Sequence, residues 1–99
     1  MAKIAIVYHS GYGHTAKVAE HVRIGATSVE GAEVTLYKAD DLTSPDTGPW
    51  DELAAADAII FGAPTYMGSA SAVFKQFQDA SSKVWFTHAW KDKIAAGFT

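Results

Sequence analysis

Two short runs of the chain are apolar or aromatic throughout. They span Ile4 to Tyr8 and Ala58 to Gly62, and continuous runs of this length are typical of strands buried on both faces, as in a parallel sheet. A third run, Glu33 to Lys38, alternates apolar with polar residues, which indicates a strand at the edge of the sheet. A fourth strand is predicted from Ile94 to Phe98.

Between these runs lie segments in which apolar residues recur at the spacing of a helix. From His14 to Val29, valine and alanine recur at every third or fourth position with charged residues between them, and Gly31 follows as a stop. A second helix is predicted from Ala70 to Ala80, and a short one after Pro49. Strands that alternate with helices predict an α/β fold, in which helices cover both faces of a parallel sheet.

The first and third predicted strands lead into the loops that are richest in glycine and hydroxyl groups. In such sheets, ligands bind beyond the carboxyl ends of the strands. The first loop, Ser10 to Thr15, precedes a helix N-terminus, where free N–H groups and the helix dipole favour an anion. Because this loop contains no lysine or arginine, it favours one phosphate held by neutral donors over a triphosphate with magnesium.

Two other interpretations of the first loop stay open. Gly11 to Ala16 also matches the dinucleotide fingerprint GxGxxG/A. That fingerprint calls for an acidic residue near the end of the second strand, where this chain has Tyr37 and Lys38, with Asp40 only beyond them. The remaining alternative is a plain strand–helix turn that uses its glycines for geometry alone.

Composition excludes several classes of function. The 99 residues predict a single domain, and a net charge of −3 argues against nucleic acid or an anionic membrane surface as a partner. The absence of cysteine excludes disulfides and thiolate chemistry. No apolar run approaches the ~20 residues of a membrane span. The apolar run at the start of the chain is too short for the core of a signal peptide. A cytoplasmic protein is therefore expected.

Histidine and tryptophan add little chemistry of their own. The spacing of His9, His21 and His88 fits no metal site, so these are interpreted as surface histidines or as satisfied by hydrogen bonds, and no metal is expected. Trp50 and Trp90 are interpreted as packing or interface residues.

The segments from Ile6 to Thr15 and from Ala58 to Gly68 carry a resemblance to the flavodoxin superfamily. The chain is most similar there to the WrbA-like NAD(P)H:quinone oxidoreductases and the NADPH-dependent FMN reductases. The segment from Phe74 to Asp79, followed by Trp85, also fits. The resemblance implies a flavodoxin-like three-layer α/β sandwich with strand order 2-1-3-4.

The resemblance also implies which residues hold the cofactor. In these families the first loop wraps the FMN phosphate and the second lies against the isoalloxazine ring. The phosphate side of the predicted site is Ser10, Tyr12, Gly13, His14 and Thr15. The ring side is Pro64, Thr65, Tyr66, Met67 and Gly68, with Trp85 lining the substrate site. The better-known WrbA proteins have arginine and phenylalanine in place of Tyr66 and Met67, so their substrate preference does not transfer.

The implied function is an FMN-dependent oxidoreductase that passes electrons from NADH or NADPH to a quinone, with no catalytic side chain required. The alternatives are a flavodoxin-type electron carrier and a truncated half-domain without activity. The family's third flavin loop, fifth strand and two further helices would follow Thr99, so residues 1–99 are expected to be the N-terminal part of an FMN-binding domain. A homo-oligomer, dimer or tetramer, is expected to form.

Overall fold

A computed structural model describes residues 2–99. Its strands are β1 (Ala2–Tyr8), β2 (Ala32–Lys38), β3 (Ala58–Gly62), β4 (Thr65–Tyr66), β5 (Ser69–Ala70) and β6 (Ile94–Phe98). Its helices are α1 (His14–Thr27), the short 3-10 helix η1 (Ala39–Leu42), α2 (Trp50–Ala55), α3 (Ala72–Ala80) and α4 (Ser82–Thr87). The alternation of long strands with helices confirms the predicted α/β class.

The main sheet has four parallel strands in the order β2-β1-β3-β6. This is the predicted order 2-1-3-4, because β4 and β5 form a separate two-stranded sheet. Ile6 in the middle of β1 is paired with Leu36 on one side and Ile60 on the other. The two strands with continuous apolar runs are therefore the inner pair, and the alternating strand β2 lies at an edge, as its pattern predicts.

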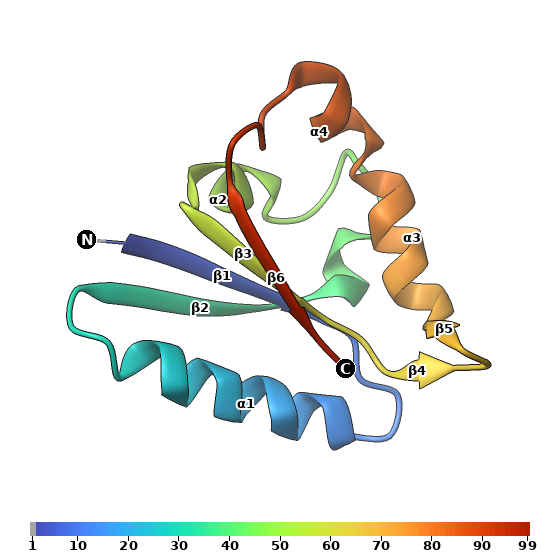
Figure 1. Ribbon diagram of the computed structural model, residues 1–99. Helices are drawn as coiled ribbons and strands as arrows, with labels where there is room; N and C mark the ends of the chain where they lie inside the picture. Colours follow the sequence, from blue (N-terminus) through green and yellow to red (C-terminus); the bar gives the residue numbers. More distant parts are fainter. Residues whose placement is uncertain (1) are drawn as a thin grey trace.

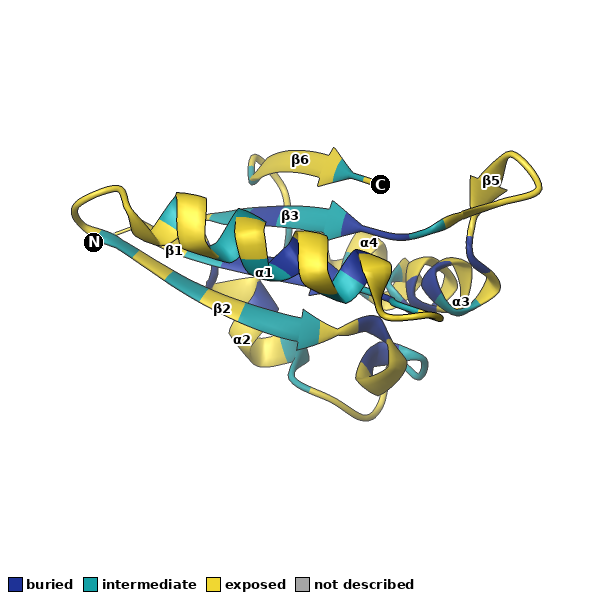
Figure 2. Cartoon of the chain, turned by 90° about the horizontal axis from the view of Figure 1, so that it is seen from below, coloured by how far each residue is buried: buried dark blue, intermediate teal, exposed yellow. Residues whose placement is uncertain are grey.

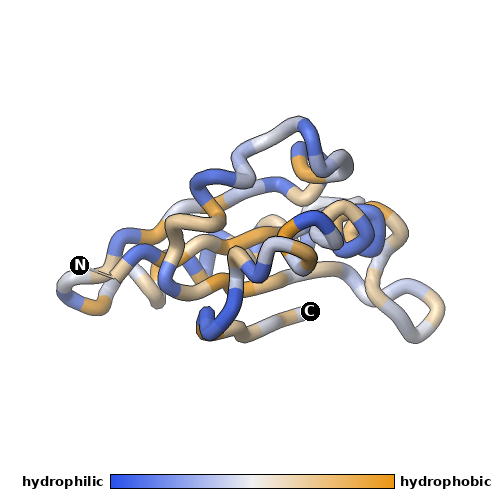
Figure 3. Tube along the Cα trace, turned by 90° about the horizontal axis from the view of Figure 1, so that it is seen from above, coloured by the Kyte–Doolittle hydropathy of each residue, from blue (hydrophilic) through white to orange (hydrophobic). Residues whose placement is uncertain are grey.

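Helices cover the two faces of this sheet unequally. Figure 1 shows α1 on one face and α2, α3 and α4 on the other. The inner strands are buried, whereas β6 and the outward side of α1 are exposed (Figure 2). Hydrophobic positions run through the middle of the fold, and hydrophilic positions lie mostly along its outside (Figure 3). The main core therefore lies between the sheet and the α2–α3 layer, where β1, β3, η1 and these two helices contribute buried residues.

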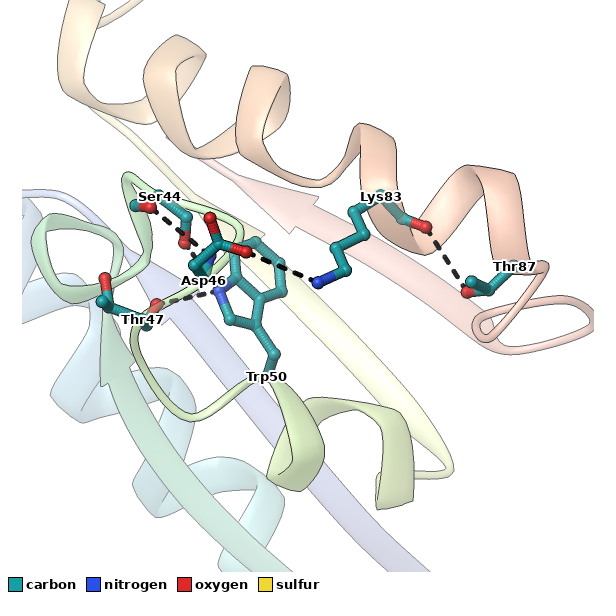
Figure 4. Close-up of polar contacts among 6 residues, drawn as sticks. All are labelled: Ser44, Asp46, Thr47, Trp50, Lys83 and Thr87. Carbon is teal, nitrogen blue, oxygen red and sulfur yellow. Dashed lines mark hydrogen bonds and ion pairs between the residues drawn. The ribbon is translucent and has the colours of Figure 1, made fainter.

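Aromatic rings fill the α2–α3 side of the core. The ring of Trp50 stacks on Phe77 at a centroid distance of 5.8 Å and on Trp90 at 6.2 Å. The indole Nε1 of Trp50 donates hydrogen bonds to the carbonyl oxygens of Ser44 and Thr47, both at 2.9 Å (Figure 4). These contacts confirm the interpretation of Trp50 and Trp90 as packing residues.

Several element bounds differ from those the sequence predicts. Helix α1 ends at Thr27 rather than Val29, and it buries Thr15 and Ala19 while Val18 faces outward. The loop predicted after Pro64 is a β-hairpin, β4–β5, so α3 begins at Ala72. Helix α4 is an addition to the predicted elements. Its six residues are too few to show a helical spacing of apolar positions, and none of them is buried.

Candidate functional site: two loops at the carboxyl edge of the sheet

The two predicted loops leave the sheet side by side. Tyr8, the last residue of β1, is paired with Gly62, the last residue of β3. The backbone N–H of His9 then donates to the carbonyl oxygen of Gly62 at 3.1 Å, which extends the ladder by one residue. Both loops therefore start from the same level of the sheet, at the carboxyl ends of its strands, where a parallel α/β sheet binds its ligands.

The first loop is folded by its own hydroxyl group. The Oγ of Ser10 accepts a hydrogen bond from the backbone N–H of Gly13 at 3.1 Å. Gly13 precedes α1 with a left-handed φ of 93°, which glycine adopts without strain. No side chain caps the start of α1, and its first turn contains no acidic residue. The N–H groups of His14 and Thr15 at that turn are consequently free to bind an anion.

The side chains of this loop differ in how far they face solvent. Tyr12 is 84% exposed and His14 is also exposed, whereas Thr15 is largely buried, at 7% exposure. Ser10 uses a lone pair to hold Gly13, so its hydroxyl hydrogen stays available as a donor. The loop thus presents neutral hydroxyl and backbone donors around a helix N-terminus, which is the chemistry that binds a phosphate group.

The second loop folds back over the first. Met67 and Gly68 form the two-residue turn of the β4–β5 hairpin, with φ angles of 51° and 78°. Two left-handed residues are typical of a type I′ hairpin turn. The Tyr66 ring meets the Tyr12 ring edge-on at a centroid distance of 6.3 Å, and the Tyr66 hydroxyl lies against Gly11. The hairpin and the first loop are therefore in direct contact beyond the carboxyl ends of β1 and β3.

The end of the described chain also reaches this site. The Thr99 hydroxyl lies 2.6 Å from the Thr65 hydroxyl, and it donates to the carbonyl oxygen of Ala63 at 3.0 Å. These bonds tie the residue after β6 to the connection between β3 and β4. Three successive strand ends, those of β1, β3 and β6, therefore meet at the same edge of the sheet (Figure 1).

The structure brings ten of the eleven predicted site residues to this edge. The exception is Trp85, which lies on α4. From there the chain returns to the start of β6, at the amino ends of the strands and away from the two loops (Figure 1). There Trp85 packs edge-on against Phe86 and, together with Trp90 and His88, lines a hollow of about 350 Å³. Its role at a substrate site stays a prediction.

Sequence reasoning missed one buried contact behind the loops. The Nδ1 of His9 and the Oγ of Ser71 form a hydrogen bond of 2.7 Å. His9 is thus satisfied by a partner, one of the two interpretations the sequence left open. Ser71 precedes α3 and would be expected to cap it, so no sequence signal pointed to this pairing. Within residues 2–99, no cluster of histidine and carboxylate side chains could hold a metal ion.

The comparisons with known proteins identify the family. The model of the family described as NADPH-dependent FMN reductase matches residues 3–99. The chain belongs to this family. The sheet order found here agrees with a flavodoxin-like α/β sandwich, the architecture of a flavodoxin, WrbA-like protein of similar structure. None of the helices in the described part of this FMN reductase family member is long and apolar enough to cross a membrane.

The chain is also similar to individual proteins and to a solved structure. The chain is 46% identical over 99 residues to "Flavodoxin FldP" of Pseudomonas aeruginosa, covering 50% of that protein. It is 37% identical over 114 aligned residues to an "NAD(P)H dehydrogenase (quinone)" of Geobacter sulfurreducens, covering 56% of it. A flavodoxin, WrbA-like protein of Agrobacterium tumefaciens superposes with a TM-score of 0.85 at 48% identity, and 59% of that protein is covered. The chain spans about half the length of the curated relatives it matches.

Proposed function

We propose that this chain belongs to an FMN-dependent oxidoreductase that passes electrons from NADH or NADPH to a quinone or a similar acceptor. The observation that carries the proposal is the uncapped start of α1, where the loop from Ser10 to Gly13 faces the β4–β5 hairpin at the carboxyl edge of the sheet. The Geobacter sulfurreducens relative named "NAD(P)H dehydrogenase (quinone)" supports the choice of acceptor.

The first loop fits the phosphate of FMN. The backbone N–H groups of His14 and Thr15, with the hydroxyl groups of Ser10, Tyr12 and Thr15, are donors for the phosphate oxygens. The loop contains no carboxylate that would repel a dianion. Gly13 has open space where a side chain would begin, so the backbone can approach the phosphate closely.

The hairpin fits the flavin ring. Pro64, Thr65 and Tyr66 lead along one side of the site, and Met67 and Gly68 turn at its rim. FMN, when bound, supplies the redox chemistry, taking up two electrons from the pyridine nucleotide and delivering them to the acceptor. The protein's residues bind and orient the ring, and no nucleophilic side chain is needed.

We also propose a domain organisation and a set of partners for this protein. Residues 1–99 are proposed to be the N-terminal part of a flavodoxin-like FMN-binding domain, which agrees with the relatives being about twice as long. The proposed partners are the small-molecule acceptor and further copies of the same protein, without nucleic acid or a membrane.

Binding of FMN to the full-length protein tests the cofactor assignment. We expect flavin fluorescence to be quenched at micromolar FMN, and no binding at that concentration would overturn the assignment. Initial rates with NADPH and a quinone test the reaction. Parallel lines in double-reciprocal plots are expected for a protein that handles the two substrates in turn, and intersecting lines contradict it.

A flavodoxin-type electron carrier is the second candidate, because the relative with 46% identity is named a flavodoxin. A carrier exchanges electrons with a protein partner and has no site for a pyridine nucleotide. Oxidation of NADPH that requires a separate reductase protein favours the carrier. Oxidation of NADPH by the purified protein and a quinone alone favours the enzyme.

A further inference from the structure

His9 and Ser71 form a buried hydrogen bond between residues that are 62 positions apart in the sequence. His9 is 9% exposed and Ser71 is 1% exposed. Buried polar groups are costly unless they are paired. Each residue therefore depends on the other, and an apolar residue at either position would leave its partner unsatisfied.

Both residues lie where a site loop begins or ends. His9 connects β1 to Ser10, and its backbone N–H is bonded to Gly62 at the end of β3. Ser71 connects β5 to α3, and its backbone N–H donates to the carbonyl oxygen of Pro64 at 3.2 Å. That second bond closes the segment from Pro64 to Ser71 on itself. The side-chain bond thus joins the base of the first loop to the base of the hairpin.

Ser71 makes this bond in place of a local one. It occupies the N-cap position of α3, where a serine hydroxyl ordinarily accepts a hydrogen bond from the first turn of the helix. In this structure its side chain caps nothing, and its hydroxyl bonds to His9 instead. The serine hydroxyl is therefore used to hold two loops together, not to stabilise the helix that follows it.

We propose that His9 and Ser71 are positioning residues that set the spacing between the phosphate side and the ring side of the flavin site. This inference rests on the proposed function. A ligand that engages both loops gains from their fixed separation, because its second contact is made without further ordering. FMN engages both loops, whereas riboflavin lacks the phosphate and engages only the hairpin. The pair should consequently strengthen FMN binding and leave riboflavin binding nearly unchanged.

The test is the preference for FMN over riboflavin with the full-length protein. It is measured by flavin fluorescence as the dissociation constant of riboflavin divided by that of FMN. His9→Phe and Ser71→Ala each remove one side of the bond and should lower this ratio by about tenfold, which corresponds to a net loss of about 1.4 kcal/mol. His9→Asn keeps a polar atom near the position of Nδ1, and Ser71→Thr keeps the hydroxyl, so both should retain most of the preference.

Two controls separate positioning from general damage. His21→Phe makes the same replacement at an exposed histidine of α1 and should leave the ratio unchanged. The double variant His9→Phe/Ser71→Ala should lower the ratio no further than either single change, because both remove the same bond. If His9→Phe does not fold, Ser71→Ala against Ser71→Thr gives the same comparison.

The outcomes distinguish this inference from the proposed function. If the wild-type protein binds no FMN, or binds FMN and riboflavin equally, the phosphate assignment fails and this inference fails with it. If the wild type prefers FMN but the variants lose both flavins by the same factor, the pair is merely structural. Equal ratios for His9→Phe and His9→Asn likewise overturn the positioning role while leaving the cofactor assignment intact.

Discussion

The hydroxyl oxygen of Tyr66 lies so close to Gly11 that a Cβ atom at position 11 would stand 2.4 Å from it. The backbone of Gly11 does not have the left-handed conformation that favours glycine. Position 11 therefore needs glycine for space and not for backbone freedom. The first loop and the hairpin are shaped to each other at this contact.

Gly11→Ala should accordingly disturb the site more than the fold. The obstructing atom is the end of a partly exposed side chain, so the Tyr66 ring can rotate away, and we expect a stability change within about 1 kcal/mol. FMN affinity should fall by about tenfold, or about 1.4 kcal/mol. A titration with FMN checks this. Adding Gly11→Ala to a Tyr66→Ala protein should cause no further loss, and a full additive loss would contradict the contact.

Thr15→Val should weaken FMN binding by about 1–3 kcal/mol, because it removes a hydroxyl donor to a charged phosphate. Valine has nearly the shape of threonine, so the buried position in α1 stays filled. Riboflavin affinity should be unchanged, since riboflavin has no phosphate. Comparable losses for the two flavins would mean that Thr15 acts through the fold.

Met67→Asn should stabilise the protein by about 1 kcal/mol. Met67 holds a φ of 51° at the hairpin turn, a conformation that costs an ordinary side chain roughly 1–2 kcal/mol and that asparagine tolerates better. Its side chain is 104% exposed, so little packing is lost. Thermal unfolding measures the change, and Met67→Ala, which keeps the strain, should give no gain.

Tyr37 predicts a loss of stability at high pH. Burial, together with the negative charge of Glu52, raises the pKa of the Tyr37 phenol. Below about pH 10, the usual pKa of tyrosine, the phenol is neutral in both the folded and the unfolded chain, so its full contribution is present. As the pH rises further, the unfolded chain ionises first and stability falls. Urea unfolding at several pH values should give a flatter decline above pH 10 for Tyr37→Phe than for the wild type.

The outer strand β6 predicts association of the 99-residue chain. Ile94 is 71% exposed there, and exposed apolar strands at a sheet edge tend to pair with other chains. Light scattering should detect dimers or larger species, and Ile94→Lys should shift them toward monomer. Val29→Lys alters an exposed valine in the connection between α1 and β2, and should have little effect because β2 is the strand farthest from β6 in the sheet order. A wild-type chain that stays a dispersed monomer would refute the prediction.

Long apolar runs made most of the fold predictable. The continuous run in β1 and the alternation in β2 determine which strand is buried on both faces and which lies at the edge. The β4–β5 hairpin was not predictable in the same way, because two-residue strands are too short to show a period. Nothing about methionine at position 67 indicates a left-handed turn, so that turn is set by its surroundings.

The sequence predicts the parts of the site whose residue types and position between a strand and a helix are themselves typical of a binding loop. Ser10 and Gly13 carry a local signal, because glycine and hydroxyl residues between a strand and a helix are typical of anion loops. The bond between His9 and Ser71 joins distant parts of the chain, and neither residue type specifies the other. Long-range polar pairs of this kind depend on the assembled tertiary structure.

The pairing of Tyr8 with Gly62 means that the lengths of β1 and β3 set the level at which the two loops leave the sheet. One residue inserted into β1 would displace the first loop by about 3.3 Å and turn the following side chains to the opposite face. Substitutions within the loops leave that level intact, because they do not alter the pairing of the strands. The two loops are therefore suited to transplantation as a matched pair, onto any parallel sheet whose adjacent strands end at the same level.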